Sequence, residues 1–508
     1  MPAEKVSLKK AAKKKRRRPP PPVSGNVACW EDDPGDPQSV PVLVTIAVPV
    51  PEQAAAPLPF KLKGPAPAPQ VYNVGSPGFL YYAAASALRR TANFWGSIVA
   101  PKTQWEVGAT LPVDVDSGVD LNAFYTRGGG GDTPGLHFFH DSVNGRVFYS
   151  GESPDVACHE MGHAVLDAIR PELFDAQFIE AAAFHESFGD MSAILSGLQV
   201  PTLRQTVLTD TGGKINRASR LSRLAEQLGA AIRVGHPDAV DDDCLRNASN
   251  SFFYSDPQAL PPSAPASQLS SEPHSFSRVF TGAFLDALAG MVATLSSSPT
   301  ADTLAAATVD AGNILVGGIL AAPAVPDYFT QVAAQMIQFA EQAPYNGKYR
   351  DAMKSAFIRK GILSLQSATN LSVQRKGGRA GAARENFATK SLATKSGALG
   401  VASIPAAQFG LKQNTLVVHA IPDPKRYAVT ASSIVQGPLQ PRSAQSAAEI
   451  YTEDIFKRGH VEVGTHAHPE NGTKHAFNFK THMVTEKNGE LHLQRLTFDC
   501  GFGNWARS

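Results

Sequence analysis

The stretch His159-Glu160-Met161-Gly162-His163 decides how this chain folds and which chemistry it can carry. Residues four apart lie on the same face of a helix, so His159 and His163 can hold one metal ion from consecutive turns, with Glu160 beside it. A catalytic zinc ion takes three protein ligands and leaves a position for water, whose proton a neighbouring Glu can accept. The pattern therefore predicts a zinc-binding helix and a third ligand elsewhere in the chain.

The residues around this motif predict a buried helix over about residues 154–170. Ser153 is a good N-cap, Pro154 suits the first helical position, and Asp155 favours the positive end of the helix dipole. Pro171 ends the helix. An exposed helix with chance histidines is the alternative, but exposed helices are rarely this apolar. The apolar positions are Val156, Ala157, Val165, Leu166 and Ile169.

A second apolar helix opens near Phe184 and carries Glu186 and Asp190 one turn apart on one face. Buried carboxylates need cationic partners. Glu186 is the natural third metal ligand, and Asp190 can accept the outer N–H of a ligand histidine and so fix its tautomer. His185 competes for the ligand role, but its side chain points about 100° away from that of Glu186.

The two motifs together resemble the thermolysin-like (gluzincin) zinc metallopeptidases, which pair His-Glu-x-x-His with a downstream Glu-x-x-x-Asp. The run from Asp155 to Asp167 is similar to the active-site helix of that family, and the resemblance covers about residues 80–365. It implies an α+β fold of two lobes, with a β-rich N-terminal lobe and an α-helical C-terminal lobe. The zinc helix is then expected in the cleft between the lobes.

The same resemblance implies a role for each residue of the motifs. It makes His159, His163 and Glu186 the ligands of one Zn²⁺ ion. Glu160 becomes the general base, and Asp190 orients His159. These assignments agree with the interpretation that the residue types and their spacing support on their own.

Two further positions match the family pattern, and two depart from it. His274 opens a long apolar helix where the family carries a histidine that stabilises the oxyanion, and Arg246 lies where the family carries a transition-state arginine. Both side chains fit that task, because cationic or N–H donors must face the oxygen where charge develops. Where the family has a carbonyl-polarising tyrosine, however, this chain has Gln177 and Phe178. Five residues before His274, where the family has an acidic residue, this chain has Leu269.

The family's structural calcium site is matched only in part. Asp155 corresponds to one of its carboxylates. Eleven residues after Glu186, however, where the family has a second acidic residue, this chain has Gly197. A calcium pair is therefore not expected, and Asp155 is interpreted as a partner of the helix dipole.

Upstream of the zinc helix the sequence is rich in strand-forming residues. An extended peptide substrate gains main-chain hydrogen bonds along a strand edge. We expect residues 136–140 to be such an edge, with Phe138 and Phe139 contacting the substrate; an interior strand is the alternative. The runs of strand formers are 111–115, 121–125, 136–140 and 146–149, separated by Gly-rich turns.

The sequence predicts four parts. Residues 1–73 are expected to be a disordered basic and Pro-rich tail, 74–365 the metallopeptidase domain, 366–400 a flexible linker, and 401–508 a separate small α+β module. The helical lobe occupies about 275–365, and its helices are expected at roughly 275–297, 301–320, 326–343 and 348–364.

The first 18 residues carry nine Lys or Arg against one Glu, a local charge of +8 in a chain whose net charge is +2. This run can bind an anionic partner or an export apparatus, and a solvated arm is the alternative. It lacks the apolar region of a secretory signal, so a cytoplasmic location or leaderless export is expected.

Other composition features narrow the class of protein. Polar residues interrupt every apolar run before about 18 residues, so no transmembrane helix is expected; in the nearest candidate they are Asp310 and Asn313. The four cysteines are far apart and suggest neither a disulfide framework nor a cysteine zinc site. They are Cys29, Cys158, Cys244 and Cys500.

The C-terminal module is expected to contain strands at 415–421 and 426–430, a helix at 444–458, and two strands that meet at Lys487-Asn488-Gly489. Six histidines occur there, for which surface positions are favoured over a second metal site. They are His460, His466, His468, His475, His482 and His492.

Two functions from different classes follow. In the first, the chain is a zinc-dependent endopeptidase acting on peptide or protein substrates. In the second, the gluzincin fold keeps its zinc but serves as a binding or delivery module with little proteolytic activity. The basic tail and the C-terminal module would then carry the function.

Overall fold

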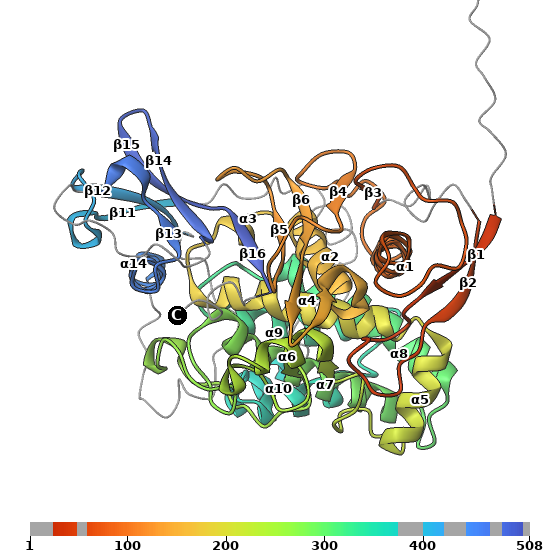
Figure 1. Ribbon diagram of the computed structural model, residues 1–508. Helices are drawn as coiled ribbons and strands as arrows, with labels where there is room; N and C mark the ends of the chain where they lie inside the picture. The colour runs from red at the N-terminus through yellow and green to blue at the C-terminus, as the bar shows by residue number, and fades with distance from the viewer. Residues whose placement is uncertain (1–23, 48–57, 374–399, 421–442, 468–479, 501–508) are drawn as a thin grey trace, which may run out of the picture.

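The computed structural model describes residues 24–47, 58–373, 400–420, 443–467 and 480–500. The predicted mixture of helices and strands is confirmed: the chain forms two five-stranded sheets and a large body of helices (Figure 1). The N-terminal basic run, the predicted strand at 426–430, and His468 and His475 lie outside the described residues.

The first five-stranded sheet has the order β16-β5-β6-β4-β3. Its strands β3, β4, β5 and β6 come from the region predicted to be β-rich, whereas β16 comes from the far end of the chain. The β7–β8 hairpin lies just before the zinc helix. The bounds are β3 Phe60–Leu62, β4 Leu111–Asp114, β5 Ala123–Thr126, β6 Gly135–Phe138, β7 His140–Val143, β8 Arg146–Tyr149 and β16 Thr497–Asp499.

The prediction that residues 136–140 form a substrate-binding edge is wrong. Strand β6 is an interior strand, hydrogen-bonded to β5 on one side and to β4 on the other, so it is not an edge to which a peptide could add. Phe138 is completely buried, and Phe139 is half-buried with its ring 5.5 Å from that of Phe124. Without β16, the edge of this part of the sheet would be β5. Strand β16 pairs with β5 and takes the edge position itself.

The predicted zinc-binding helix is α2, Pro154–Ile169, which agrees with the predicted bounds within one residue. The Ser153 hydroxyl accepts a hydrogen bond from the Val156 N–H at 3.2 Å, which is the expected N-cap contact. Helix α2 packs against α1, Pro77–Gly96, and against α4, Ile179–Gly197, the second predicted helix. Every residue of α4 is buried, so its carboxylates lie inside the protein.

Two glycines let α2 and α4 approach closely. A Cβ atom at Gly162 would lie 2.8 Å from the Ser192 Cβ and 3.0 Å from the Gly189 Cα. A Cβ atom at Gly189 would lie 2.6 Å from the His159 ring. Contacts of this length do not occur between real side chains, so both positions need the smallest residue. The close approach brings the motif residues of the two helices into one site.

The helical part follows the prediction. Helix α7 packs against α4 and α10, and α8 packs against α9. The described helices α7 and α8 are long and apolar enough to span a membrane by length and composition, but 67% and 56% of their most apolar windows are buried in the protein. The bounds are α5 Pro201–Thr211, α6 Glu226–Arg233, α7 Pro273–Leu295, α8 Ala301–Ala321, α9 Tyr328–Ala340 and α10 Arg350–Arg359.

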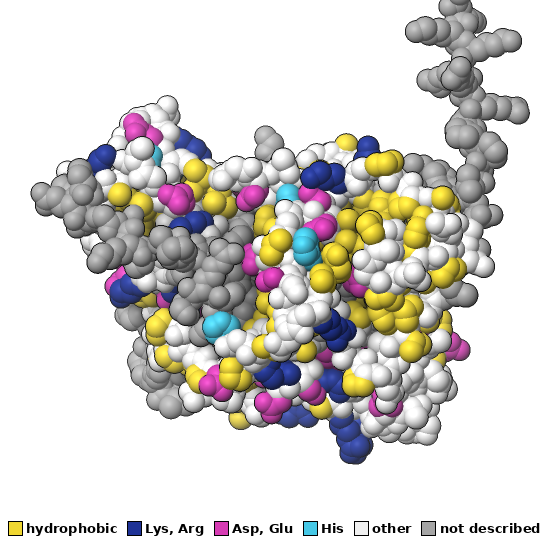
Figure 2. Space-filling view, in the orientation of Figure 1, with side chains coloured by type: hydrophobic (Ala, Val, Ile, Leu, Met, Phe, Trp, Pro, Cys, Tyr) yellow, Lys and Arg dark blue, Asp and Glu magenta, His cyan; other side chains and the backbone are white. Residues whose placement is uncertain are grey.

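The prediction of disorder over residues 1–73 is wrong for the part that the structure describes. Strands β1, Ser24–Cys29, and β2, Val42–Ala47, form an antiparallel hairpin, and the Trp30 and Phe79 rings meet edge to face 5.9 Å apart. Hydrophobic side chains gather on this side of the molecule in Figure 2. The segment escaped prediction because the carboxylates of its loop, such as Asp33, are buried through contacts with distant parts of the chain.

The second five-stranded sheet has the order β11-β12-β15-β14-β13 and packs with helix α14, so the α+β character of the C-terminal part is confirmed. Asn488 and Gly489 have positive φ in the predicted turn between β14 and β15. The predicted linker begins with a helix, α11. The bounds are α11 Leu365–Val373, β11 Gly400–Pro405, β12 Thr415–Ala420, α14 Ala444–Lys457, β13 Val461–Glu462, β14 His482–Lys487 and β15 Glu490–Arg495.

The prediction that residues 401–508 form a separate module is wrong. After β15 the chain continues into β16, which joins the first sheet beside β5 (Figure 1). The Leu496 N–H bonds to the Thr481 carbonyl within the module. The next residue, Thr497, pairs with Thr126 in the first sheet, so the chain passes from one sheet to the other between these two residues. The last described strand therefore fixes the module to the sheet that lies beside α2.

Candidate metal centre

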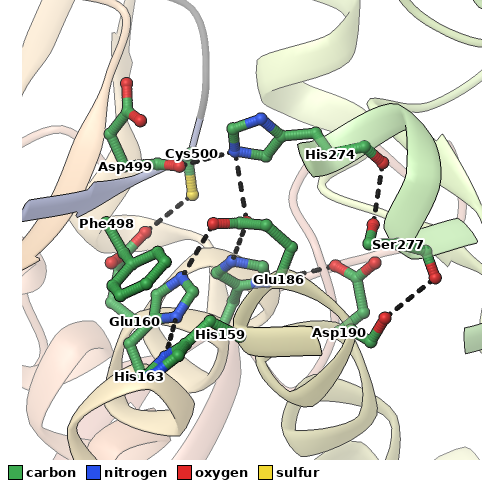
Figure 3. A network of polar contacts seen from close by, with 12 residues as sticks. His159, Glu160, His163, Glu186, Asp190, His274, Ser277, Phe498, Asp499 and Cys500 are labelled. Atoms are coloured by element: carbon green, nitrogen blue, oxygen red, sulfur yellow. Dashed lines mark hydrogen bonds and ion pairs between the residues drawn. The ribbon is translucent and has the colours of Figure 1, made fainter. Parts of the chain in front are cut away.

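The two imidazoles and the carboxylate singled out from the sequence converge at one point (Figure 3). His159 Nε2 lies 3.3 Å from Glu186 Oε2, and His163 Nε2 lies 3.7 Å from Glu186 Oε1. All three ligand atoms lie within 4.8 Å of one another. A tetrahedral zinc site with bonds of about 2.1 Å has edges of about 3.4 Å between ligand atoms. The observed spacing matches that geometry.

The three residues fit a metal ion better than they fit one another. His159 Nε2, His163 Nε2 and Glu186 Oε2 are buried and lack a hydrogen bond of acceptable geometry within the described part of the chain, although Glu186 lies within ion-pair distance of both rings. Buried polar atoms without a partner are costly and rare. In a metal site, the ligand atoms lie close together and point at a shared ion, and so they do not form hydrogen bonds with one another.

Asp190 lies behind His159, as the sequence predicted. The His159 Nδ1 atom is 3.1 Å from Asp190 Oδ1, and Arg246 Nη2 donates to the same oxygen at 2.9 Å. Burial raises the pKa of Asp190, but Arg246 and His159 outweigh it and hold that pKa at about 2. An ionised Asp190 accepts the His159 Nδ1–H, which leaves Nε2 with its lone pair toward the metal position.

Arg246 belongs to strand β10, Arg246–Asn247, and its guanidinium pairs with Asp190 through two contacts, at 2.9 Å and 3.4 Å. The sequence predicted a contact with the reacting oxygen. In this structure the contacts of Arg246 are instead with the carboxylate that orients His159. Burial lowers the pKa of Arg246, but Asp190 and, more weakly, Glu186 raise it above its ordinary value. The charge of Arg246 therefore still acts on the centre.

His274 lies at the N-terminal end of α7 and faces the metal position from the side opposite α2. Its Nδ1 atom is 2.6 Å from Glu272 Oε1, and its Nε2 atom is 3.1 Å from Glu186 Oε2. Burial lowers the pKa of His274, but Glu186 and Glu272 together raise it well above its ordinary value. His274 therefore presents an N–H donor at the site, which is the property that the oxyanion role requires.

Glu160 is completely buried beside the ligands. Burial raises its pKa to about 8, against an opposing effect of His159. Its Oε1 accepts a hydrogen bond from the Cys500 thiol at 2.8 Å, and its Oε2 has no hydrogen-bond partner among the described residues. A carboxyl group with a pKa near neutrality is suited to both accepting and delivering a proton.

The sequence did not indicate that Phe498, Asp499 and Cys500 belong to this site. The Phe498 ring stacks on His185 at 4.0 Å and on His163 at 5.2 Å. The Cys500 thiol lies within 4.8 Å of ligand atoms of His159 and Glu160, so a cysteine does reach the metal centre. The only local indication was the short strand-forming run at the end of the chain, since the partners lie more than 300 residues away.

His185, the competing ligand, points elsewhere. It is completely buried, its Nδ1 atom is 3.4 Å from His163 Nδ1, and its ring packs against Phe498 and Phe174. Burial lowers its pKa well below the ordinary value. It supports His163 from behind and does not face Glu186.

Two of the positions where the chain departs from the family pattern, Gln177 and Phe178, lie just before α4, and the third, Leu269, lies before α7. Gln177 is buried, and its N–H bonds to the carbonyl of His419 in β12. Phe178 is the N-cap residue of α4. Leu269 is half-buried against the core. Gln177 thus contacts the C-terminal part of the chain.

Asp155 lies in the first turn of α2, as its interpretation as a helix-dipole partner expected, but it is not alone there. Oxygens of Asp33, Asp155 and Glu226 lie within 4.8 Å of one another and could hold a second cation. The Ala225 N–H bonds to Asp155 at 3.0 Å, while Glu226 Oε2 has no hydrogen-bond partner in the segments that the structure describes. The sequence missed this group because Asp33 and Glu226 are nearly 200 residues apart.

The described histidines of the C-terminal part form no metal site among the residues that the structure places. His482 is completely buried, with its ring 5.9 Å from that of Tyr451, so the prediction of surface positions is wrong for this residue. His460, His466 and His492 are half-buried.

Comparison of the chain with protein families and with curated proteins found no match to either. The geometry of the site therefore carries the functional argument.

Proposed function

We propose that this chain is a zinc-dependent endopeptidase with a thermolysin-like fold of two lobes. The observation that supports the proposal most is the convergence of His159, His163 and Glu186, whose ligand atoms lie within 4.8 Å of one another. Glu160 lies beside them with a pKa of about 8. Ligands, base and their arrangement on two neighbouring helices are those that zinc hydrolysis of a peptide requires.

Each residue has a defined task in this proposal. His159, His163 and Glu186 would hold Zn²⁺, which when bound supplies a Lewis acid and lowers the pKa of water to about 7. Glu160 takes a proton from the attacking water and delivers it to the leaving amine.

His274 donates from Nε2 to the oxygen that becomes negative. Asp190 keeps His159 in the tautomer that binds metal, and Arg246 keeps Asp190 ionised.

A polypeptide is the substrate class that the surroundings favour. Strand β5 pairs with β6 on one side and with only the short strand β16 on the other, and an extended peptide in place of β16 can pair with β5 through its main chain. Phe138 and Phe139 lie on the interior strand β6 and are not part of that edge. Substrate contacts would therefore come from β5 and from the pocket between Glu186 and α14.

One observation favours the alternative of a zinc-containing binding module. The residues Thr497 to Cys500 lie along β5 and across the metal position, so the described chain leaves little room for a substrate there. A protein with this arrangement could keep its metal and hydrolyse nothing.

The test combines metal analysis with cleavage of a peptide library by full-length protein, in the wild type and in Cys500→Ala, each with and without Glu160→Gln. One zinc per chain with chelator-sensitive cleavage that disappears with Glu160→Gln supports the peptidase. One zinc per chain with no cleavage by either parent protein supports the binding module. Absence of zinc after loading contradicts both.

A further inference from the structure

The residues that close the chain's described part lie in the cleft as an extended peptide. Strand β16 pairs antiparallel with β5, with Thr497 opposite Thr126 and Asp499 opposite Phe124. The Cys500 N–H extends the pairing and donates to the Ala123 carbonyl at 2.8 Å. An extended peptide substrate would add to the same edge in the same way. The segment Thr497–Cys500, called here the cleft strand, thus takes the place of a substrate.

The carbonyl group of the cleft strand lies where a reacting carbonyl is expected. His274 Nε2 donates a hydrogen bond to the Asp499 carbonyl oxygen at 2.6 Å (Figure 3). The same nitrogen is the proposed donor to the oxyanion during hydrolysis. The Asp499–Cys500 peptide bond therefore lies at the position of the bond that would be cut.

The side chain of Cys500 meets the catalytic base directly. Its thiol donates to Glu160 Oε1 at 2.8 Å and so occupies one of the two carboxylate oxygens that could accept a proton from water. The sulfur also lies within 4.8 Å of ligand atoms of His159 and Glu160, and His159 Nε2 is buried without a hydrogen bond. Thiolate sulfur is a preferred ligand of zinc, with Zn–S bonds of about 2.3 Å.

The cleft strand is held at both ends. The Phe498 ring stacks on His163 and His185, and the Arg495 guanidinium lies 4.3 Å from the Phe498 ring centroid. Arg495 also donates to the Tyr451 hydroxyl at 2.6 Å, which connects the strand to α14 of the C-terminal sheet domain. The packing of the Phe498 ring on both sides therefore anchors the cleft strand in its position.

We propose that the cleft strand keeps this chain latent, with Cys500 as the fourth ligand of the zinc ion and its sulfur in the position of the attacking water. The thiol gives its proton to Glu160 Oε1, to which it is hydrogen-bonded, when it binds the ion as a thiolate. Four protein ligands make a closed zinc site, whereas hydrolysis needs an open position. Activity then requires that the cleft strand leaves. This inference rests on the proposed zinc site and on the proposed peptidase activity, and the tests separate the two.

The first test detects the metal–sulfur bond without any assay of activity. Full-length protein is loaded with Co²⁺ in place of zinc, and its near-ultraviolet absorption is compared with that of Cys500→Ala and of Cys29→Ala. Cys29 is equally buried but belongs to β1, so it serves as the matched control. A sulfur-to-cobalt charge-transfer band in the wild type and in Cys29→Ala, and its absence in Cys500→Ala, supports the proposal. A spectrum that Cys500→Ala leaves unchanged overturns it.

The second test measures latency. If the cleft is open in a tenth of the molecules or fewer, replacing the sulfur raises peptide cleavage about tenfold or more. Cys500→Ala is expected to show this gain, and Cys29→Ala is expected to match the wild type. Equal cleavage by wild type and Cys500→Ala overturns latency while leaving the peptidase intact. A charge-transfer band in proteins that never cleave supports the fourth ligand and removes the peptidase.

Mass spectrometry of the zinc-loaded wild type completes the test. The proposal expects the chain to remain intact at the Asp499–Cys500 bond, because the sulfur excludes the attacking water. Cleavage at that bond, lost with Glu160→Gln, would make the segment a substrate for self-processing and would overturn the proposal.

Discussion

His159 Nδ1 lies 3.1 Å from Asp190 Oδ1, and this contact joins the metal-binding motif of α2 to the acidic motif of α4. Since Asp190 is ionised and fixes the tautomer of His159, Asp190→Asn is expected to weaken zinc binding about 10- to 100-fold. A competition titration with a chromogenic chelator measures this change. Asp351→Asn, at an exposed carboxylate of α10, is the control and is expected to leave the affinity unchanged. An unaltered affinity in Asp190→Asn would show that His159 is oriented by its packing alone.

Glu160→Gln is expected to separate metal binding from chemistry. The amide keeps the size of the side chain, so zinc stoichiometry should stay at the wild-type value. Loss of the general base should lower kcat about 10²- to 10⁴-fold. The measurement is made in the Cys500→Ala background, so that the cleft strand does not mask the effect. A variant that retains full cleavage would assign the base to another group.

Gly189 sets the distance between α2 and α4, and its replacement should disturb both stability and metal binding. A Cβ atom there would lie 2.6 Å from the His159 ring, so Gly189→Ala forces the ring or the helices to move. Overpacking of this kind costs about 1–3 kcal/mol of unfolding free energy. Thermal unfolding and zinc titration check the two effects.

The control for this substitution is Gly235→Ala, because a Cβ atom at Gly235 meets no atom within 4 Å. It is expected to change neither the unfolding temperature nor the zinc affinity. If Gly189→Ala behaves in the same way, the close approach of the helices is not what positions the ligands.

The local parts of the site could be predicted from the sequence because their causes are local. The N-cap at Ser153, the i, i+4 spacing of the histidines and the Glu186/Asp190 pair each follow from helix geometry, and α2 agrees with its predicted bounds within one residue. The start of α4 lies five residues before the predicted one, since apolar residues such as Ile179 extend the helix.

The parts that escaped prediction depend on contacts between distant segments. Nothing near Cys500 indicates that Thr497 pairs with Thr126, because strand pairing across 370 residues has no signature in either strand. Burial of Asp33 likewise depends on donors far along the chain, the Ser153 hydroxyl and the Gln227 N–H. From the sequence alone, a carboxylate in a Pro-rich segment therefore predicts a solvated loop.

The carboxylates near the N-terminus of α2 are expected to make stability fall as pH rises. Burial raises the pKa of Asp32 to about 7 and that of Glu226 to about 11, and it raises the pKa of Asp155 as well. The ordinary values, which apply to the unfolded chain, lie near 4. Between about pH 5 and pH 7 the folded protein therefore binds more protons than the unfolded chain, so the free energy of unfolding decreases as pH rises.

Urea unfolding at several pH values in the presence of a chelator measures this slope. Glu226→Gln removes one of the titrating groups and is expected to flatten it. Added calcium should do the same if the oxygens of Asp33, Asp155 and Glu226 share a cation, because the ion neutralises their mutual repulsion. A stability that rises with pH in the chelated protein would mean that these carboxylates are ionised in the folded state.

Phe498 determines how firmly the cleft strand is held, so its removal should expose Cys500. The ring is 3% exposed and stacks on His185 at 4.0 Å. Truncating a buried Phe to Ala costs about 3–5 kcal/mol. If that cost applies to the closed state alone, opening of the strand becomes about 10²-fold or more frequent. Alkylation of Cys500 by iodoacetamide, followed by mass spectrometry, should accelerate accordingly in Phe498→Ala.

Phe409→Ala, which removes an aromatic ring stacked on Phe456 elsewhere in the C-terminal domain, should leave the rate near that of the wild type. Equal acceleration in both variants would mean that Cys500 becomes accessible through general loosening of that domain, and not through release of the cleft strand.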